Sequence, residues 1–179
     1  MVKKCMNSEK YIKSREFFNN NDNIIKNKLH PIVVCWKLNT PSNIGSILRL
    51  ADNMACEKIL LVDDNPSFRK GKIKQTAQSS FNVVKWQFCN SKTWMDSIPE
   101  DYHMIAIETS SSAKNLYKTI LPEKCALVLG NEKRGIDPKI LKKCNETIFI
   151  PMKGSNKSMN VGHALTIVLG EWIRQNYYF

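Results

Sequence analysis

The sequence predicts an α/β fold in which a mostly parallel sheet is flanked by helices. Short, continuous apolar runs of strand length recur along the chain, and helical patterns separate them. Strands of a parallel sheet are buried on both faces, so they read as continuous apolar runs and not as alternating ones. The length of 179 residues and the hydrophobic content of 42% suit one domain with a substantial core.

The first β-α-β unit is the clearest part of this pattern. Residues 31–38 (PIVVCWKL) are a β-branched and aromatic run, which predicts a strand. Residues 40–42 (TPS) predict a turn with a helix N-cap. The apolar residues that follow are spaced like one face of a helix, at Ile44, Ile47, Leu48, Ala51 and Ala55. Residues 58–62 (KILLV) predict the second buried strand, which completes the unit.

The downstream elements are less sharply marked. The basic segment 69–80 is expected to hold a loop and a short helix. Further strands are predicted at residues 83–88, 104–108, 125–129 and 147–150. Further helices are predicted at residues 91–98, 138–144 and 161–175. The chain contains no internal repeat, so one domain over residues 30–179 is the expected organisation.

Residues 1–29 are expected to form a basic, Asn/Lys-rich extension that is mobile or partly helical. Its first residues lack the apolar centre of a secretory signal. The longest apolar stretch of the chain, near the C-terminus, is too short and too often interrupted to span a bilayer. We therefore expect a cytoplasmic protein without membrane contact.

The charge balance points to a polyanionic partner. The chain has 27 Lys and Arg residues against 16 Asp and Glu residues, a net charge of +11. A general bias of the composition towards Lys and Asn is the alternative. The six cysteines form no C-x-x-C pair and only three histidines accompany them, so no metal site is expected.

Three polar segments follow predicted strands or precede the last predicted helix, at residues 43–49, 129–135 and 155–161. In an α/β sheet, ligands bind outside the C-terminal ends of the strands, so these segments are candidates for a binding site. Each has a plainer interpretation when taken alone, as a helix cap with a surface cation or as a strand-to-helix turn. Neither the P-loop pattern nor the dinucleotide glycine pattern is present.

Together the segments resemble the motifs of the SPOUT superfamily of RNA methyltransferases, in its SpoU/TrmH branch of ribose 2′-O-methyltransferases. The resemblance covers roughly residues 31–175. The first motif is Asn43-x-Gly45-x-x-x-Arg49, and the second is Leu129-Gly130-Asn131-Glu132-x-x-Gly135. The third is Ile150-Pro151-Met152 followed by Ser158-Met159-Asn160-Val161. One departure is Gly162, where relatives usually have Ser; His163 after it is interpreted as a locally bonded or dimer-contact residue.

The resemblance implies a deep trefoil knot at the C-terminal end of the sheet, a rare exception to unknotted topology. It implies S-adenosylmethionine as cofactor, held largely through backbone groups at Thr109, Gly130, Asn131, Ile150, Met152, Ser158 and Met159. It also implies a homodimer in which the first motif of one subunit approaches the cofactor of the other.

A ribose 2′-hydroxyl is a poor nucleophile, so a transferase must align it and help to remove its proton. The resemblance assigns this task to Arg49, with Asn43, Glu132, Ser158 and Asn160 around it. Because a guanidinium stays protonated, we favour orientation and phosphate binding over base catalysis for Arg49. The remaining RNA contacts are expected from a cationic loop with Arg69, Lys70, Lys72 and Lys74.

The expected function is therefore S-adenosylmethionine-dependent methylation of a ribose 2′-hydroxyl in RNA. We favour tRNA because the chain has no sizeable extra domain beyond the basic extension. The alternatives are an rRNA substrate and a non-catalytic RNA-binding module on the same fold. A generic nucleotide-binding α/β protein is less consistent, because its glycine pattern is missing.

Overall fold

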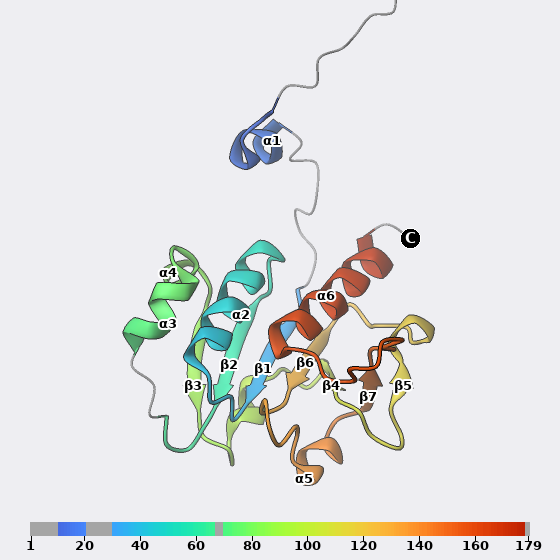
Figure 1. The fold of residues 1–179 in the computed structure, drawn as a ribbon. Helices are drawn as coiled ribbons and strands as arrows, with labels where there is room; N and C mark the ends of the chain where they lie inside the picture. Colours follow the sequence, from blue (N-terminus) through green and yellow to red (C-terminus); the bar gives the residue numbers. More distant parts are fainter. Residues whose placement is uncertain (1–10, 21–29, 67–69, 178–179) are drawn as a thin grey trace, which may run out of the picture.

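The computed structural model describes residues 11–20, 30–66 and 70–177 (Figure 1). Within these ranges the chain forms one seven-stranded sheet in the order β3-β2-β1-β6-β4-β7-β5. All of the neighbouring strands pair in parallel. The strands are β1 (Ile32–Trp36), β2 (Lys58–Val62), β3 (Trp86–Cys89), β4 (His103–Ile107), β5 (Lys114–Asn115), β6 (Cys125–Leu129) and β7 (Glu146–Phe149). The predicted α/β class with a parallel sheet is confirmed.

Helices cover both faces of the sheet. They are α1 (Ser14–Asn20), α2 (Pro41–Asn53), α3 (Lys70–Ala77), α4 (Ser80–Val83), α5 (Pro138–Leu141) and α6 (Val161–Tyr177), with 3-10 turns η1 (Trp94–Ser97) and η2 (Leu116–Lys118). Alternate side chains along a strand point to opposite faces of the sheet. Val33 and Cys35 of β1 pack in the same cluster as α2, α3 and α6, whereas Ile32 and Val34 pack with η1 and α5. The described helices are not long and apolar enough to cross a membrane.

The strand order brings together loops that are far apart in the sequence. β6 lies between β1 and β4, and β7 follows β4 on the other side. Because all of these strands run in the same direction, their C-terminal ends lie along one edge. The loops after β1, β6, β4 and β7 are therefore neighbours there. The second and third motif segments lie mainly in these loops, and the first begins in the first turn of α2, directly after the loop that follows β1.

Two predicted elements differ from the structure, and one strand was not predicted. The strand predicted from Val83 begins only at Trp86, because Val83 ends α4 and the Trp86 indole N–H donates to the carbonyl of Phe81 at 3.0 Å. The helix predicted at 91–98 is only the short 3-10 turn η1, held by the buried Trp94. β5 was not predicted, because its two polar residues carry no apolar pattern and pair with β7 only in the tertiary fold.

The N-terminal extension is described only in part. Residues 14–20 form α1, which agrees with the expected partly helical segment. The rest of the predicted extension, residues 1–10 and 21–29, lies outside the described residues.

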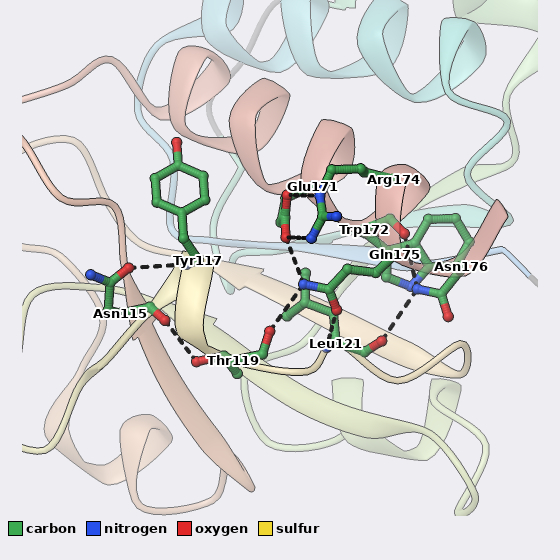
Figure 2. Close-up of polar contacts among 9 residues, drawn as sticks. All are labelled: Asn115, Tyr117, Thr119, Leu121, Glu171, Trp172, Arg174, Gln175 and Asn176. Carbon is green, nitrogen blue, oxygen red and sulfur yellow. Dashed lines mark hydrogen bonds and ion pairs between the residues drawn. The ribbon is translucent and has the colours of Figure 1, made fainter. Parts of the chain in front are cut away.

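The C-terminal end of α6 is joined to residues 119–122 by side-chain hydrogen bonds, and Figure 2 shows those to Thr119 and Leu121. The Trp172 indole N–H donates to the carbonyl of Pro122 at 2.9 Å. Gln175 accepts from the Leu121 amide at 2.8 Å and donates to the Thr119 carbonyl at 3.0 Å, while Asn176 donates to the Leu121 carbonyl at 3.2 Å. These contacts, which we call the α6 clamp, give backbone groups of an irregular segment the partners that a strand would have provided.

Candidate functional site

A cavity of about 450 Å³ opens at the C-terminal edge of the sheet. This volume lies within the range of about 300–1,000 Å³ that is typical of small-molecule sites. The loops after β4, β6 and β7 line it, together with the N-terminal turns of α2 and α6. Ten of the predicted site residues are part of the lining: Asn43, Thr109, Gly130, Asn131, Glu132, Ile150, Met152, Ser158, Met159 and Asn160.

Glu132 joins the loop after β6 to the start of α2. Its Oε2 accepts from the Asn39 amide at 3.0 Å, and its Oε1 accepts from the Thr40 amide at 3.1 Å and from Asn43 Nδ2 at 2.9 Å. Partial burial acts to raise the pKa of Glu132, but these hydrogen bonds to the charged form outweigh it and leave the pKa below its ordinary value. The ionised Glu132 side chain therefore has a structural role, since its hydrogen bond fixes the orientation of the Asn43 side chain.

Asn160 continues this chain of hydrogen bonds to the third motif. Its Nδ2 donates to Asn43 Oδ1 at 3.1 Å, and its Oδ1 accepts from the Gly162 amide at 2.8 Å. The second bond makes Asn160 the N-cap of α6. A Cβ atom on Gly162 would lie 3.2 Å from Asn160 Oδ1, closer than side chains normally pack, so glycine leaves room for this cap. His163 is exposed beside it.

Asn131 and the two glycines of the second motif shape the loop after β6. Asn131 Oδ1 accepts from the amides of Lys133 and Arg134, both at 3.0 Å, and Asn131 Nδ2 donates to the Lys37 carbonyl. A Cβ atom on Gly130 would lie 2.4 Å from the carbonyl carbon of Gly135. The side chain of Asn131 is thus occupied within the protein, and its backbone N–H and carbonyl pair with those of Gly135 across the same loop.

Glu108 lines the cavity but was not predicted as a site residue. Its Oε1 accepts from the Thr109 amide at 2.9 Å, and its Oε2 accepts from the Ile136 amide at 3.0 Å. In the sequence it ends the apolar run MIAIE, and the prediction counted it as part of the strand. An acidic side chain at the C-terminal end of a buried parallel strand was the signal that could have identified it.

Arg49 is the predicted catalytic residue that does not line the cavity. It is exposed on α2, and its Nη1 donates to Gln78 Oε1 at 3.3 Å. It follows Asn43 by six residues, which is about 9 Å along a helix. Gly45, in the same motif, faces α3, because a Cβ atom there would lie 2.6 Å from the Thr76 Cβ. The second half of the first motif therefore points away from the cavity of its own chain.

The other predicted RNA-binding residues lie elsewhere. Lys70, Lys72 and Lys74 are exposed on α3, and this part of the expected cationic loop is helical. Arg69 lies outside the described residues. None of these three lysines lines the cavity, whereas Lys133 and Lys157, which were not predicted, do. Over residues 11–20, 30–66 and 70–177, no group of three or more His, Cys, Asp or Glu side chains could hold a metal ion.

Comparison with known proteins agrees with this arrangement. Residues 30–170 match the model of the SpoU rRNA Methylase family. The chain is 27% identical over 157 residues to the 23S rRNA (guanosine-2'-O-)-methyltransferase RlmB of Pasteurella multocida (strain Pm70), covering 86% of this chain and 64% of that protein. It is 30% identical over 136 residues to the RlmB of Salmonella typhi, covering 75% of this chain and 56% of that protein. The chain thus spans less than two thirds of the length of these curated relatives.

Solved structures share the fold. The AdoMet-bound rRNA methyltransferase from Sinorhizobium meliloti superposes with a TM-score of 0.74 at 19% identity, over 84% of this chain and 58% of that one. The TrmH/SpoU tRNA modifying enzyme of A. aeolicus gives 0.73 at 22% identity, over 86% of this chain and 78% of that one. With the family model matched over residues 30–170, and with its three motif segments meeting at one cavity, this chain belongs to the SpoU rRNA methylase family.

Proposed function

We propose that the chain is an S-adenosylmethionine-dependent RNA methyltransferase that acts on a ribose 2′-hydroxyl. The observation that carries the proposal is the chain of hydrogen bonds from Glu132 through Asn43 to Asn160 at the cavity. It links the three motif segments that the family resemblance assigns to catalysis and cofactor binding. The RlmB relatives are named for the same reaction.

The cavity fits the cofactor in size and in chemistry. Its lining combines apolar side chains, which suit an adenine ring and a thioether carbon chain, with loop backbone and carboxylates that suit polar groups. We assign cofactor binding to Thr109, Gly130, Asn131, Ile150, Met152, Ser158 and Met159, all of which line the cavity. Bound S-adenosylmethionine would supply an electrophilic methyl group.

We also propose the deep trefoil knot that the family implies. It is supported by the path of the chain between β7 and α6, where Ile150, Met152 and residues 157–160 line the same cavity as the loops after β4 and β6. If the segment between β7 and α6 forms the last pass of the knot, Ser158 and Met159 come to lie beside Gly130. The cofactor assignment requires this placement.

Arg49, which the resemblance places at the reaction site, lies outside the cavity lining of its own chain, and the cations that do line the cavity are Lys133 and Lys157. We therefore propose a homodimer in which Arg49 of a second copy completes each site. Its protonated guanidinium would orient the RNA phosphate and the 2′-hydroxyl. Asn43 and Asn160 are held by Glu132 and by the α6 N-terminus, so they can present fixed polar groups to the nucleotide.

We propose rRNA as the substrate class, in place of the tRNA that the sequence favoured. The curated relatives from Pasteurella multocida and Salmonella typhi are named as 23S rRNA methyltransferases. tRNA is the second candidate, favoured by the structural likeness to the tRNA modifying enzyme of A. aeolicus. Either substrate is consistent with the net charge of +11 and with a cytoplasmic location.

The test is methyl transfer from radiolabelled S-adenosylmethionine to rRNA and tRNA, followed by digestion to nucleosides. We expect label in a 2′-O-methylnucleoside from rRNA. Label in tRNA alone would show that tRNA, and not rRNA, is the substrate class. Cofactor binding without methyl transfer to any RNA would favour the non-catalytic RNA-binding module.

The Arg49→Ala variant tests the assignment of roles. We expect transfer to fall by at least about a hundredfold, the usual effect of removing one transition-state donor. Calorimetry should show cofactor affinity close to that of the unsubstituted protein, and Arg49→Lys should retain part of the activity because it keeps the charge. Full activity of Arg49→Ala would remove Arg49 from the mechanism.

A further inference from the structure

Two carboxylates line the cavity, and they differ in how much of their hydrogen-bonding capacity the protein uses. Glu132 accepts three hydrogen bonds, two on Oε1 and one on Oε2. A carboxylate offers about four lone-pair sites, so Glu132 is nearly saturated. It is also exposed. Glu132 thus holds two loops together and has little left to offer a ligand.

Glu108 is held in a different way. The amides of Thr109 and Ile136 each donate to one of its oxygens, at 2.9 Å and 3.0 Å. The Thr109 hydroxyl lies 3.4 Å from Oε1, too far for a strong O–H···O bond. Each oxygen therefore keeps acceptor capacity, and the two amides, from loops after different strands, fix the plane of the carboxylate.

The backbone around Glu108 is built to accommodate the carboxylate. Gly135 has a φ of +66°, and a Cβ atom there would lie only 2.4 Å from Glu108 Oε2. Any other residue at position 135 would meet both backbone strain and a clash with the carboxylate. The glycine of the second motif is therefore what lets Glu108 lie against the loop after β6.

A rigid carboxylate with one open acceptor site on each oxygen matches a vicinal diol, which presents two O–H donors side by side. Acidic side chains at the C-terminal ends of parallel strands bind ribose hydroxyls in other α/β nucleotide sites. We propose that Glu108 accepts hydrogen bonds from the 2′- and 3′-hydroxyls of the adenosyl ribose. The inference rests on the proposed function, and it names a side chain for a cofactor site otherwise assigned largely to backbone groups.

The test is calorimetric titration with S-adenosylhomocysteine and with its 2′,3′-dideoxy analogue, in the full chain. The unsubstituted protein should bind the analogue about tenfold to a hundredfold more weakly, the range for hydrogen bonds to a charged group. In Glu108→Ala the two ligands should bind with affinities within about twofold of each other, because the group that distinguishes them is gone.

Two further variants keep the result interpretable. Glu132→Gln changes the other carboxylate of the cavity and should preserve the full ratio between the two ligands. Glu108→Gln keeps the side-chain shape and one acceptor oxygen, so its ratio should be intermediate, and thermal unfolding should show that it is folded. An unchanged ratio in Glu108→Ala would overturn the inference alone. No binding of S-adenosylhomocysteine to the unsubstituted protein would instead overturn the proposed function.

Discussion

The two ends of α6 are both rich in hydrogen bonds, yet they do different things. At the C-terminal end, the α6 clamp pairs Trp172, Gln175 and Asn176 with the backbone of residues 119–122, and Figure 2 shows the contacts of Gln175 and Asn176. At the N-terminal end, Asn160 caps the helix and contacts Asn43 at the edge of an open cavity. The number of polar contacts alone would therefore identify the wrong end as the site.

Burial explains the difference. Leu165, Val168, Leu169 and Trp172 are at most 1% exposed, so α6 is fixed to the core along its length. Residues 153–158, just before the helix, are all exposed. Because core packing and the clamp at its C-terminal end hold α6 in place, its polar N-terminal end can lie at a ligand site without needing the ligand to position the helix. We expect substitutions in the clamp to change the stability of the protein. Substitutions at the N-terminal end of α6 should instead change ligand binding and methyl transfer.

The largest effect on stability is expected from Trp172→Ala. The side chain is 1% exposed and its indole N–H donates to the Pro122 carbonyl. Removing it should cost about 3–5 kcal/mol in the free energy of unfolding, measured with urea. Trp172→Phe keeps most of the apolar area and should lose only about 1–3 kcal/mol, from the unpaired carbonyl. Equal losses in the two variants would show that the hydrogen bond and not the packing carries the clamp.

A smaller effect on stability, with a large one on activity, is expected from Asn160→Ala. Losing the N-cap should cost about 1 kcal/mol. Asn160→Asp keeps the acceptor for the Gly162 amide but cannot donate to Asn43, whose own amide nitrogen is already bonded to Glu132. Asn160→Asp should therefore be nearly as stable as the unsubstituted protein and still lose most methyl transfer. Normal methyl transfer by Asn160→Asp would show that the hydrogen bond between Asn160 and Asn43 is not needed for catalysis.

The smallest effect is a pH dependence that comes from Glu132. Its pKa is lowered by the hydrogen bonds to its charged form, against the opposing effect of burial. Its contribution to stability should be complete above the ordinary pKa of 4.5 and should fade as pH drops through the lowered folded value. The difference in unfolding free energy between the unsubstituted protein and Glu132→Gln should therefore shrink between pH 7 and pH 3. A constant difference would contradict the account.

The sequence was sufficient for the parts of the fold that follow local rules. The run from Cys125 to Leu129 is a strand because both of its faces are buried, which a continuous apolar pattern reveals. The helix that starts at Pro41 has a proline in its first turn, where the missing N–H costs nothing. The three motif segments could be placed at one edge because they lie beside strand or helix ends.

The rest depended on contacts that no local pattern carries. Gly135 is required because a carboxylate 27 residues earlier in the chain, on Glu108, lies against it. Lys133 and Lys157 reach the cavity because the loops after β6 and β7 meet there, whereas Lys70, Lys72 and Lys74 do not line it. The orientation of Arg49 towards Gln78 likewise depends on how α2 packs against α3.

The central claim is that the ligand site lies at the N-terminal end of α6 and not at the clamp. Hydrogen–deuterium exchange of the protein with and without S-adenosylhomocysteine tests this claim most directly. We predict slower exchange for amides of residues 108–109, 130–136 and 150–162, and no change in residues 115–122 and 171–177. Protection of the clamp without protection of the three loops would contradict the account.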